Sequence, residues 1–280
     1  MAGMPRPAAL PSPSDERESI GGRDLGRWQS GIGRTVLDVV RRAALIVVRV
    51  GRFSLANVAL TLTLLVGGGV AVLLTHAAGE VYESVVDTGG VAGLDDPVLD
   101  AAVGARSTTL DGWVTRFTDV GGTVGMPVLA TVVVLALALW WRRWTPVVLM
   151  AGAAAGSVLM TVAGKELTGR ARPPMELAVP PLESSPSFPS GHTLNATVVV
   201  GVLAYLLLIR LVRPAARVAV LLAASGFVLA MGLSRVYLGH HWLSDVVAAW
   251  LFGLGWLAVV VTAHRVMVTL GRVDPVRPRR

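Results

Sequence analysis

Long apolar segments recur along this chain and constrain its fold more than any other feature. Runs of roughly 18–22 residues carry almost no charge, and that length spans the hydrocarbon core of a bilayer as an α-helix. The composition agrees, because 53% of the residues are hydrophobic and only 15% are charged, against about a quarter in ordinary soluble domains. The sequence therefore predicts an all-α, polytopic membrane protein.

Six segments are long and apolar enough to form a bundle of transmembrane helices. They are residues 54–76, 125–142, 145–164, 193–210, 215–238 and 243–265. We therefore expect a transmembrane domain at 54–266, followed by a basic tail at 267–280. A polar segment at 77–124 separates the first two spans and has room for short helices.

The N-terminal part divides into two segments. Residues 1–33 are rich in Pro, Gly, Ser and Arg without periodicity, which predicts a disordered tail. Residues 34–53 place basic side chains on one side of a helix and apolar side chains on the other. This pattern predicts an amphipathic juxtamembrane helix lying on the membrane surface.

The charges of the connecting segments predict the orientation. Six spans place the basic segments 1–53, 140–144, 210–217 and 265–280 on one side, which is then cytoplasmic. The opposite segment, 77–124, is acidic. We therefore expect a multi-pass protein of the plasma membrane with both termini cytoplasmic. The net charge of +7 reflects these loops, so a bilayer and not a nucleic acid is the expected partner, and no oligomeric state is predicted.

Cations at two predicted span ends oppose this charge rule. Lys165, the only lysine in the chain, lies near Arg172, and Arg235 ends the fifth span. Arg170 is a further cation on this outer side. Ionisable groups at such positions are candidates for function. The alternative is that these long basic side chains only extend to place their charge at the membrane–water interface. Lys165 and Arg172 are seven positions apart, so a continuing helix would point both in one direction.

The stretch "SFPSGHT" at 187–193 has the composition of an anion site at a helix start. Ser190 stands near the expected N-cap, and Gly191 lets a ligand approach the backbone. The free N–H groups of a first helical turn favour an anion, which His192 would adjoin. The alternative is an ordinary helix cap with an incidental histidine.

The stretch "SRVYLGHHWLSD" at 234–245 contains two adjacent histidines, of which only the second is expected to have a catalytic role. Gly239 is suited to end the fifth span, and the sixth span would begin near Trp242. His241 and Asp245 are four positions apart, so the carboxylate can hold one ring nitrogen and leave the other free to attack. His240 would face elsewhere, at the membrane edge. A structural ion pair is the alternative.

All three clusters fall on the outer face, and together they suit phosphoryl transfer. Cations can neutralise phosphoryl oxygens while one group attacks and another protonates the leaving oxygen. The chain has no cysteine and few carboxylates near these histidines, and the cations would repel a divalent ion. We therefore expect no metal site and no cofactor.

The motifs resemble those of the type 2 phosphatidic acid phosphatase superfamily, which also includes the vanadium haloperoxidases. That family carries Lys-x6-Arg-Pro, Pro-Ser-Gly-His and Ser-Arg-x5-His-x3-Asp, and this chain matches all three in order. The resemblance implies that His241 is a nucleophile that forms a phosphohistidine, that Asp245 orients it, and that His192 is the acid and then the base. It also implies a set of phosphate-binding residues, namely Lys165, Arg172, Ser190, Gly191 and Arg235.

The resulting hypothesis is an integral membrane lipid phosphatase that needs no metal and acts at the outer membrane face. The resemblance implies a lipid phosphate or diphosphate substrate, such as undecaprenyl diphosphate, phosphatidylglycerol phosphate or phosphatidic acid. A lipid phosphotransferase that uses the same intermediate is one alternative. A catalytically silent lipid-binding membrane protein is another.

Overall fold

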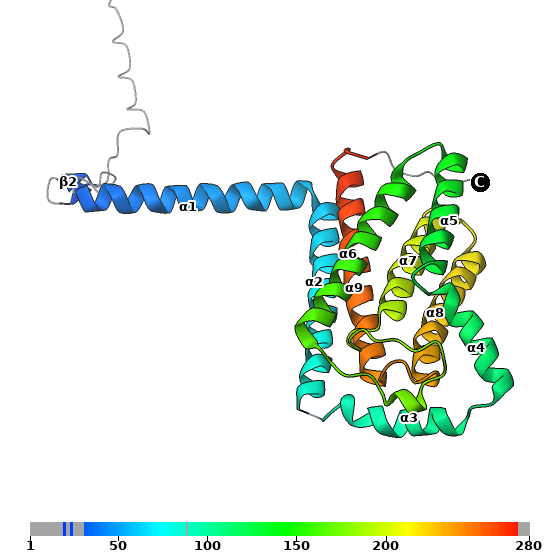
Figure 1. Ribbon diagram of the computed structural model, residues 1–280. Coiled ribbons are helices and arrows are strands. Elements are labelled where there is room, and N and C mark those ends of the chain that lie inside the picture. The colour runs from blue at the N-terminus through cyan, green and yellow to red at the C-terminus, as the bar shows by residue number, and fades with distance from the viewer. Residues whose placement is uncertain (1–18, 21–22, 25–30, 88, 274–280) are drawn as a thin grey trace, which may run out of the picture. The chain divides into compact units, whose positions relative to one another are not determined.

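The computed structural model describes residues 19–20, 23–24, 31–87 and 89–273, in two units, 1–58 and 59–280 (Figure 1). In the first unit, β1 (Ser19–Ile20) and β2 (Arg23–Asp24) form a two-residue antiparallel pair, and α1 spans Gly31–Ala56. The segment expected to be an amphipathic helix lies within α1. Most of the expected disordered tail lies outside the described residues.

Every regular element that the structure describes in the second unit is a helix. Its elements are α2 (Val58–Val86), η1 (Ala92–Leu94), α3 (Asp95–Gly104), α4 (Thr108–Val120), α5 (Gly125–Trp141), α6 (Thr145–Thr168), η2 (Met175–Leu177), α7 (Gly191–Leu208), α8 (Pro214–Tyr237) and α9 (Leu243–Thr269). Five of these helices, α2, α6, α7, α8 and α9, are long and apolar enough to cross a bilayer. A sixth span results if α4 and α5, bent by 50°, count as one. The all-α membrane bundle predicted from the sequence is confirmed.

Two helix boundaries differ from the prediction. The first span was expected to begin at residue 54, but α1 continues to Ala56 and α2 begins at Val58, with a turn at Asn57 between them. The predicted end at residue 76 is also wrong, because α2 continues to Val86 and carries polar side chains on its last turns. The room expected for short helices in 77–124 is filled by α3 and α4.

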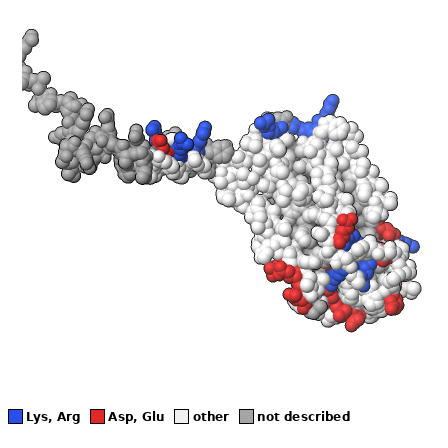
Figure 2. Space-filling model, turned by 60° about the vertical axis from the view of Figure 1, so that its left-hand side comes forward, with Lys and Arg blue, Asp and Glu red and all other residues white. Residues whose placement is uncertain are grey.

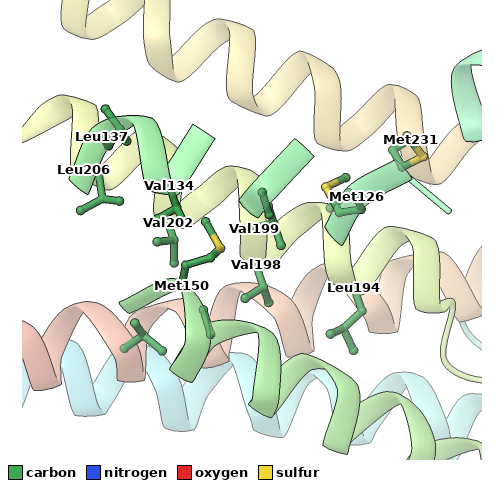
Figure 3. Close-up of a cluster of buried hydrophobic side chains, with 14 of the residues drawn as sticks. Met126, Val134, Leu137, Met150, Leu194, Val198, Val199, Val202, Leu206 and Met231 are labelled. Carbon is green, nitrogen blue, oxygen red and sulfur yellow. The ribbon is translucent and has the colours of Figure 1, made fainter. Parts of the chain in front are cut away.

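Small residues allow the helices of the bundle to approach closely. The most buried helix, α7, packs against α6, α8 and α9. Ala153, Ala196 and Ala249 are fully buried at these contacts, as expected where helices associate in a bilayer by close packing. Figure 3 shows larger side chains filling the space between α5, α6 and α7, where Val134, Met150 and Val202 lie together.

The two ends of the second unit differ in charge (Figure 2). Acidic side chains gather at the end that holds α3, α4 and the segment between α6 and α7, with basic side chains among them. At the opposite end, the charged side chains that the structure describes are basic. Because the connections between successive spans alternate between the ends, the ends of α6 and α8 meet the beginnings of α7 and α9 at the acidic end (Figure 1).

Gly156 tests this packing, because a Cβ at this position would lie 2.1 Å from Cε2 of the Trp256 ring. The ring cannot move freely, since its Nε1 donates to the Ala153 carbonyl at 3.1 Å. We expect Gly156→Ala to lower the stability in detergent by about 1–3 kcal/mol. Gly152→Ala, on the same helix with no atom within 4 Å, is the control and should be neutral or slightly stabilising. Equal melting temperatures for the two variants would contradict this account.

Candidate active site

A cavity of about 540 Å³ lies at the acidic end of the bundle and brings together residues from every predicted cluster. Five predicted site residues line it, namely Lys165, Gly191, His192, Arg235 and His241. The other three stand close behind them, since Asp245 and Arg172 contact His241, and the Ser190 N–H donates to the Asp245 carbonyl at 3.2 Å. The three sequence-distant clusters therefore form one site.

His241 and Asp245 form the predicted pair. Gly239 ends α8 with a φ of 71°, and α9 begins at Leu243, so His241 lies in the turn that the sequence indicated. Its Nδ1 lies 3.3 Å from Oδ2 of Asp245, whose side chain is fully buried. If Nδ1 carries the proton and donates to this carboxylate, Nε2 keeps its lone pair for a ligand.

The environment of His241 keeps its imidazole neutral. Burial lowers the pKa of His241 to about 4, although the hydrogen bond and the charge of Asp245 act in the opposite direction. The ring therefore stays unprotonated at neutral pH, and an unprotonated Nε2 is a nucleophile. Nε2 also lies 3.2 Å from Nη1 of Arg172, which can donate to it in this resting structure.

The predicted geometry of Lys165 and Arg172 is wrong in one respect. The helix does not continue from one to the other, because α6 ends at Thr168 and Gly169 follows with a φ of 55°. The loop after Gly169 carries Arg172 back over the site instead. Arg172 Nη1 donates to the His240 carbonyl there, and its Nη2 lies 2.7 Å from Oε2 of Glu183.

Glu183 is a site residue that the sequence analysis missed. Its carboxylate bridges Arg172 and Arg235, two of the three cations predicted to bind phosphate. Burial alone would raise the pKa of Glu183, but the charges of Arg235 and Arg172 outweigh it and hold the pKa at about 2. A negative charge therefore already lies among these cations. No local motif marks Glu183, which reaches them through space.

The N-terminus of α7 forms the floor of the cavity. Ser190 is the N-cap residue as predicted, but its hydroxyl does not cap the helix and instead lies 2.9 Å from that of Thr193. The first-turn N–H groups are consequently not satisfied by this side chain, which suits an anion. His192 lines the cavity beside this turn, and a Cβ at Gly122 would lie 3.6 Å from its Nε2.

His240 lies beside His241 and also lines the cavity. Its side chain is buried, and its Nε2 lies 2.7 Å from the Val179 carbonyl. This contact ties the segment between α6 and α7 to the end of α8. The imidazoles of His240 and His241 therefore have different partners, as their helical phase predicted.

Three further side chains hold Asp245 in place and were not assigned to the site from the sequence. Arg170 Nη1 lies 2.5 Å from Oδ1 of Asp245, and the Ser187 hydroxyl donates to Oδ2. Asp95, the first residue of α3, pairs with Arg170 at 2.7 Å. Arg170 had one sequence signal, since it is a cation on the side where cations are disfavoured.

The arrangement suits the transfer of a tetrahedral anionic group. A neutral imidazole, a second histidine, three cations and a helix N-terminus converge on one cavity, so attack, proton transfer and charge neutralisation can occur together. Within the described residues, no group of three or more His, Asp or Glu side chains is placed to hold a metal ion. The positive charge in the cavity comes from side chains.

Comparisons with known proteins agree with this chemistry. Residues 144–267 match the model of the PAP2 superfamily. Phosphatidylglycerophosphatase B of Bacillus subtilis is 29% identical over 175 residues, which cover 62% of this chain and 85% of that protein. The crystal structure of a transmembrane PAP2-type phosphatidylglycerolphosphate phosphatase from Bacillus subtilis superposes with a TM-score of 0.58 at 27% identity, covering 71% of this chain and 94% of that one. LpxE of Aquifex aeolicus gives a TM-score of 0.47 at 21% identity, covering 60% of this chain and 94% of that chain.

Proposed function

We propose that this chain, which belongs to the type 2 phosphatidic acid phosphatase (PAP2) superfamily, hydrolyses a lipid phosphomonoester through a phosphohistidine on His241. The proposal starts from its activity as a membrane phosphatase that acts on lipid phosphates. The single observation that carries this mechanism is the pairing of the buried His241 with Asp245 at a cavity lined by cations. The membership argues against the catalytically silent alternative.

In the first step, Nε2 of His241 attacks the phosphorus. The bond between phosphorus and the lipid oxygen breaks, and its electron pair stays on that oxygen, which takes a proton from the imidazolium form of His192 and leaves that ring neutral. The imidazole of His241 becomes positively charged as it is phosphorylated, and Asp245 stabilises that charge. The lipid leaves as an alcohol.

In the second step, water attacks the phosphorus and gives a proton to His192. The phosphorus–nitrogen bond breaks, inorganic phosphate leaves, and His241 returns to its neutral form. In both steps Lys165, Arg172 and Arg235 neutralise the phosphoryl oxygens, together with the N–H groups that follow Ser190. We therefore expect the reaction to proceed without a metal ion or a cofactor.

Phosphatidylglycerol phosphate is the substrate that we propose first. The curated relative and the solved structure from Bacillus subtilis are both named as phosphatidylglycerol phosphate phosphatases, and each is matched over most of its own length. Phosphatidic acid, which is also a phosphomonoester, and undecaprenyl diphosphate, which would lose its terminal phosphoryl group and leave as a lipid monophosphate, belong in the same test. An acceptor alcohol in place of water would turn the same intermediate to phosphotransfer.

We also propose that the cavity faces the outside of the plasma membrane and that both termini are cytoplasmic. The support comes from charge. The connections from α5 to α6 and from α7 to α8, opposite the cavity, carry Arg142, Arg143 and Arg213. Acidic side chains gather at the cavity end (Figure 2). A cavity on the outer side would receive lipid phosphates from the outer leaflet.

The mechanism predicts unequal effects for the two adjacent histidines. With purified protein, phosphate release from the three lipids is measured with a chelator present. We expect His241→Ala to lose at least about 10³-fold in kcat, since the nucleophile is gone. His240→Ala loses the contact with the Val179 carbonyl and one side chain of the cavity wall, but no attacking group, and should lose less than about tenfold in kcat. His76 is exposed on α2, so His76→Ala is the control for replacing a histidine outside the cavity and should leave kcat unchanged.

Three results would count against the mechanism. They are equal losses for the two adjacent histidines, activity that disappears with the chelator, and wild-type activity that survives in His241→Ala. Transfer to an added alcohol without release of inorganic phosphate would instead identify a phosphotransferase.

The orientation can be tested with single cysteines, because the chain has none of its own. Asp100 on α3 and Arg213 before α8 are both exposed and lie at opposite ends of the bundle. In intact cells, a membrane-impermeant maleimide should label Asp100→Cys at once and Arg213→Cys only after lysis. The reverse pattern would place the cavity on the cytoplasmic side.

A further inference from the structure

Asp245 is held by a second carboxylate through an arginine that no motif includes. Arg170 Nη1 lies 2.5 Å from Oδ1 of Asp245, and Arg170 Nη2 lies 2.7 Å from Oδ2 of Asp95. Asp95 is 4% exposed and also accepts from the N–H of Ser244 at 2.8 Å and from its hydroxyl at 2.7 Å. Asp95 therefore fixes both Arg170 and the residue that precedes Asp245.

This arrangement determines which oxygen of Asp245 faces the nucleophile. A carboxylate can rotate about its Cβ–Cγ bond, but Oδ1 is engaged by a charge-assisted bond to Arg170. Oδ2 then faces His241 Nδ1, the Ser187 hydroxyl and the N–H of Trp242. The orientation of the imidazole thus depends on a contact on the far side of the carboxylate.

We propose that Arg170 and Asp95 are positioning residues for the His241–Asp245 pair, and that α3 supports the reaction from the outer surface of the bundle. Neither side chain lines the cavity, so neither touches the substrate. Their effect should therefore fall on kcat, through the orientation of His241, and leave KM nearly unchanged. This inference rests on the proposed function of His241.

The test measures kcat and KM for phosphate release by Arg170→Met, Arg170→Lys and Asp95→Asn. We expect Arg170→Met to lower kcat by about tenfold to a hundredfold with KM within about threefold, as for a small misplacement of a reacting group. Arg170→Lys should recover part of the loss, because it keeps a cation at Asp245. Arg116→Met is the matched control, since Arg116 is an exposed cation of the same face that stacks on Trp113.

A double variant separates positioning from general stability. Because Asp95 acts through Arg170 and, in addition, through Ser244, the combined Asp95→Asn and Arg170→Met variant should lose less kcat than the product of the two single losses. Multiplied losses, or an unchanged kcat in Arg170→Met, would overturn the proposal. These two results can be obtained only if the wild type is active. An inactive wild type would contradict the proposed function instead, so the two failures can be told apart.

An independent observation concerns the loop that precedes α7. Every predicted phosphate-binding cation contacts residues 183–186 in the resting protein. Lys165 Nζ donates to the Ser185 hydroxyl at 2.8 Å and to the Pro186 carbonyl. Arg172 donates to the Ser185 carbonyl at 2.7 Å and to its hydroxyl at 3.1 Å, and both arginines bond to Glu183.

The carboxylate of Glu183 takes the place that two phosphoryl oxygens would need. One of its oxygens contacts Arg172 and the other contacts Arg235, and Glu183 lines the cavity together with His192 and His241. The three nitrogens of the Arg172 guanidinium are all engaged by the protein. A phosphate cannot reach these donors unless residues 183–186 give way.

The geometry points to Glu183 as an internal anion that closes the site until a phosphate displaces it. The closed state competes with the ligand, so it weakens every anion by the same factor, which is the ratio of closed to open protein. The carboxylate would return when inorganic phosphate leaves. This second inference also rests on the proposed phosphate site.

Binding of inorganic phosphate tests the closure without turnover. Calorimetry on the full chain in detergent compares wild type with Glu183→Gln, which removes the charge and keeps the shape. We expect the Kd for phosphate to fall by about tenfold or more. Glu176→Gln, an exposed acid of the same loop, is the matched control and should leave the Kd unchanged.

Any other result of this binding measurement contradicts one part of the proposal. An unchanged Kd in Glu183→Gln would show that the carboxylate does not compete, and a higher Kd would show that it holds the arginines in place for the ligand. Either result overturns the closure alone. Failure of both proteins to bind phosphate would overturn the phosphate site as well. Glu183→Ala serves as a second variant should Glu183→Gln not fold.

Discussion

Positive charge held inside the protein at one end of the bundle is the constraint on which the site depends. Arg235 is 2% exposed, and a desolvated guanidinium needs partners, which Glu183 and Thr118 provide. Lys165 and Arg172 are satisfied in a similar way by the loop before α7. The same three cations that are paired within the resting protein would therefore pair with a bound phosphate. The stability of the resting site and its affinity for an anion are linked for this reason.

The bundle makes this concentration of charge possible. Successive spans run in opposite directions, so the ends of α6 and α8 lie beside the beginnings of α7 and α9 (Figure 1). Small residues such as Ala153 and Ala249 allow the helices to approach closely, and apolar side chains fill the space below the site. The outer helices complete it, because Asp95 on α3 and Thr118 on α4 contact charged side chains from the loop and from α8. A segment with no recognisable motif thereby becomes part of the site.

Sequence reasoning found the residues whose signals are local. The pairing of His241 with Asp245 follows from a spacing of four, and the stop at Gly239 follows from the freedom of glycine at positive φ. It failed where the same signal was overlooked: α6 ends before Gly169, so Arg172 reaches the site through a loop and not through two further helical turns. Asp95 and Glu183 escaped for another reason: they act on arginines 75 and 52 positions away, where no spacing rule applies.

The sequence by itself determined the class of fold, the side of the bundle on which the motifs gather and the type of chemistry, because apolar length, charge bias and motif spacing are properties of the chain. Only the tertiary structure decided how the charges are paired. Folding brings charged side chains that are distant in the sequence next to one another. Arg170 thereby lies between Asp245 and Asp95, and Glu183 lies among the phosphate-binding cations. Electrostatic pairing depends on distance in space, which a linear sequence does not record.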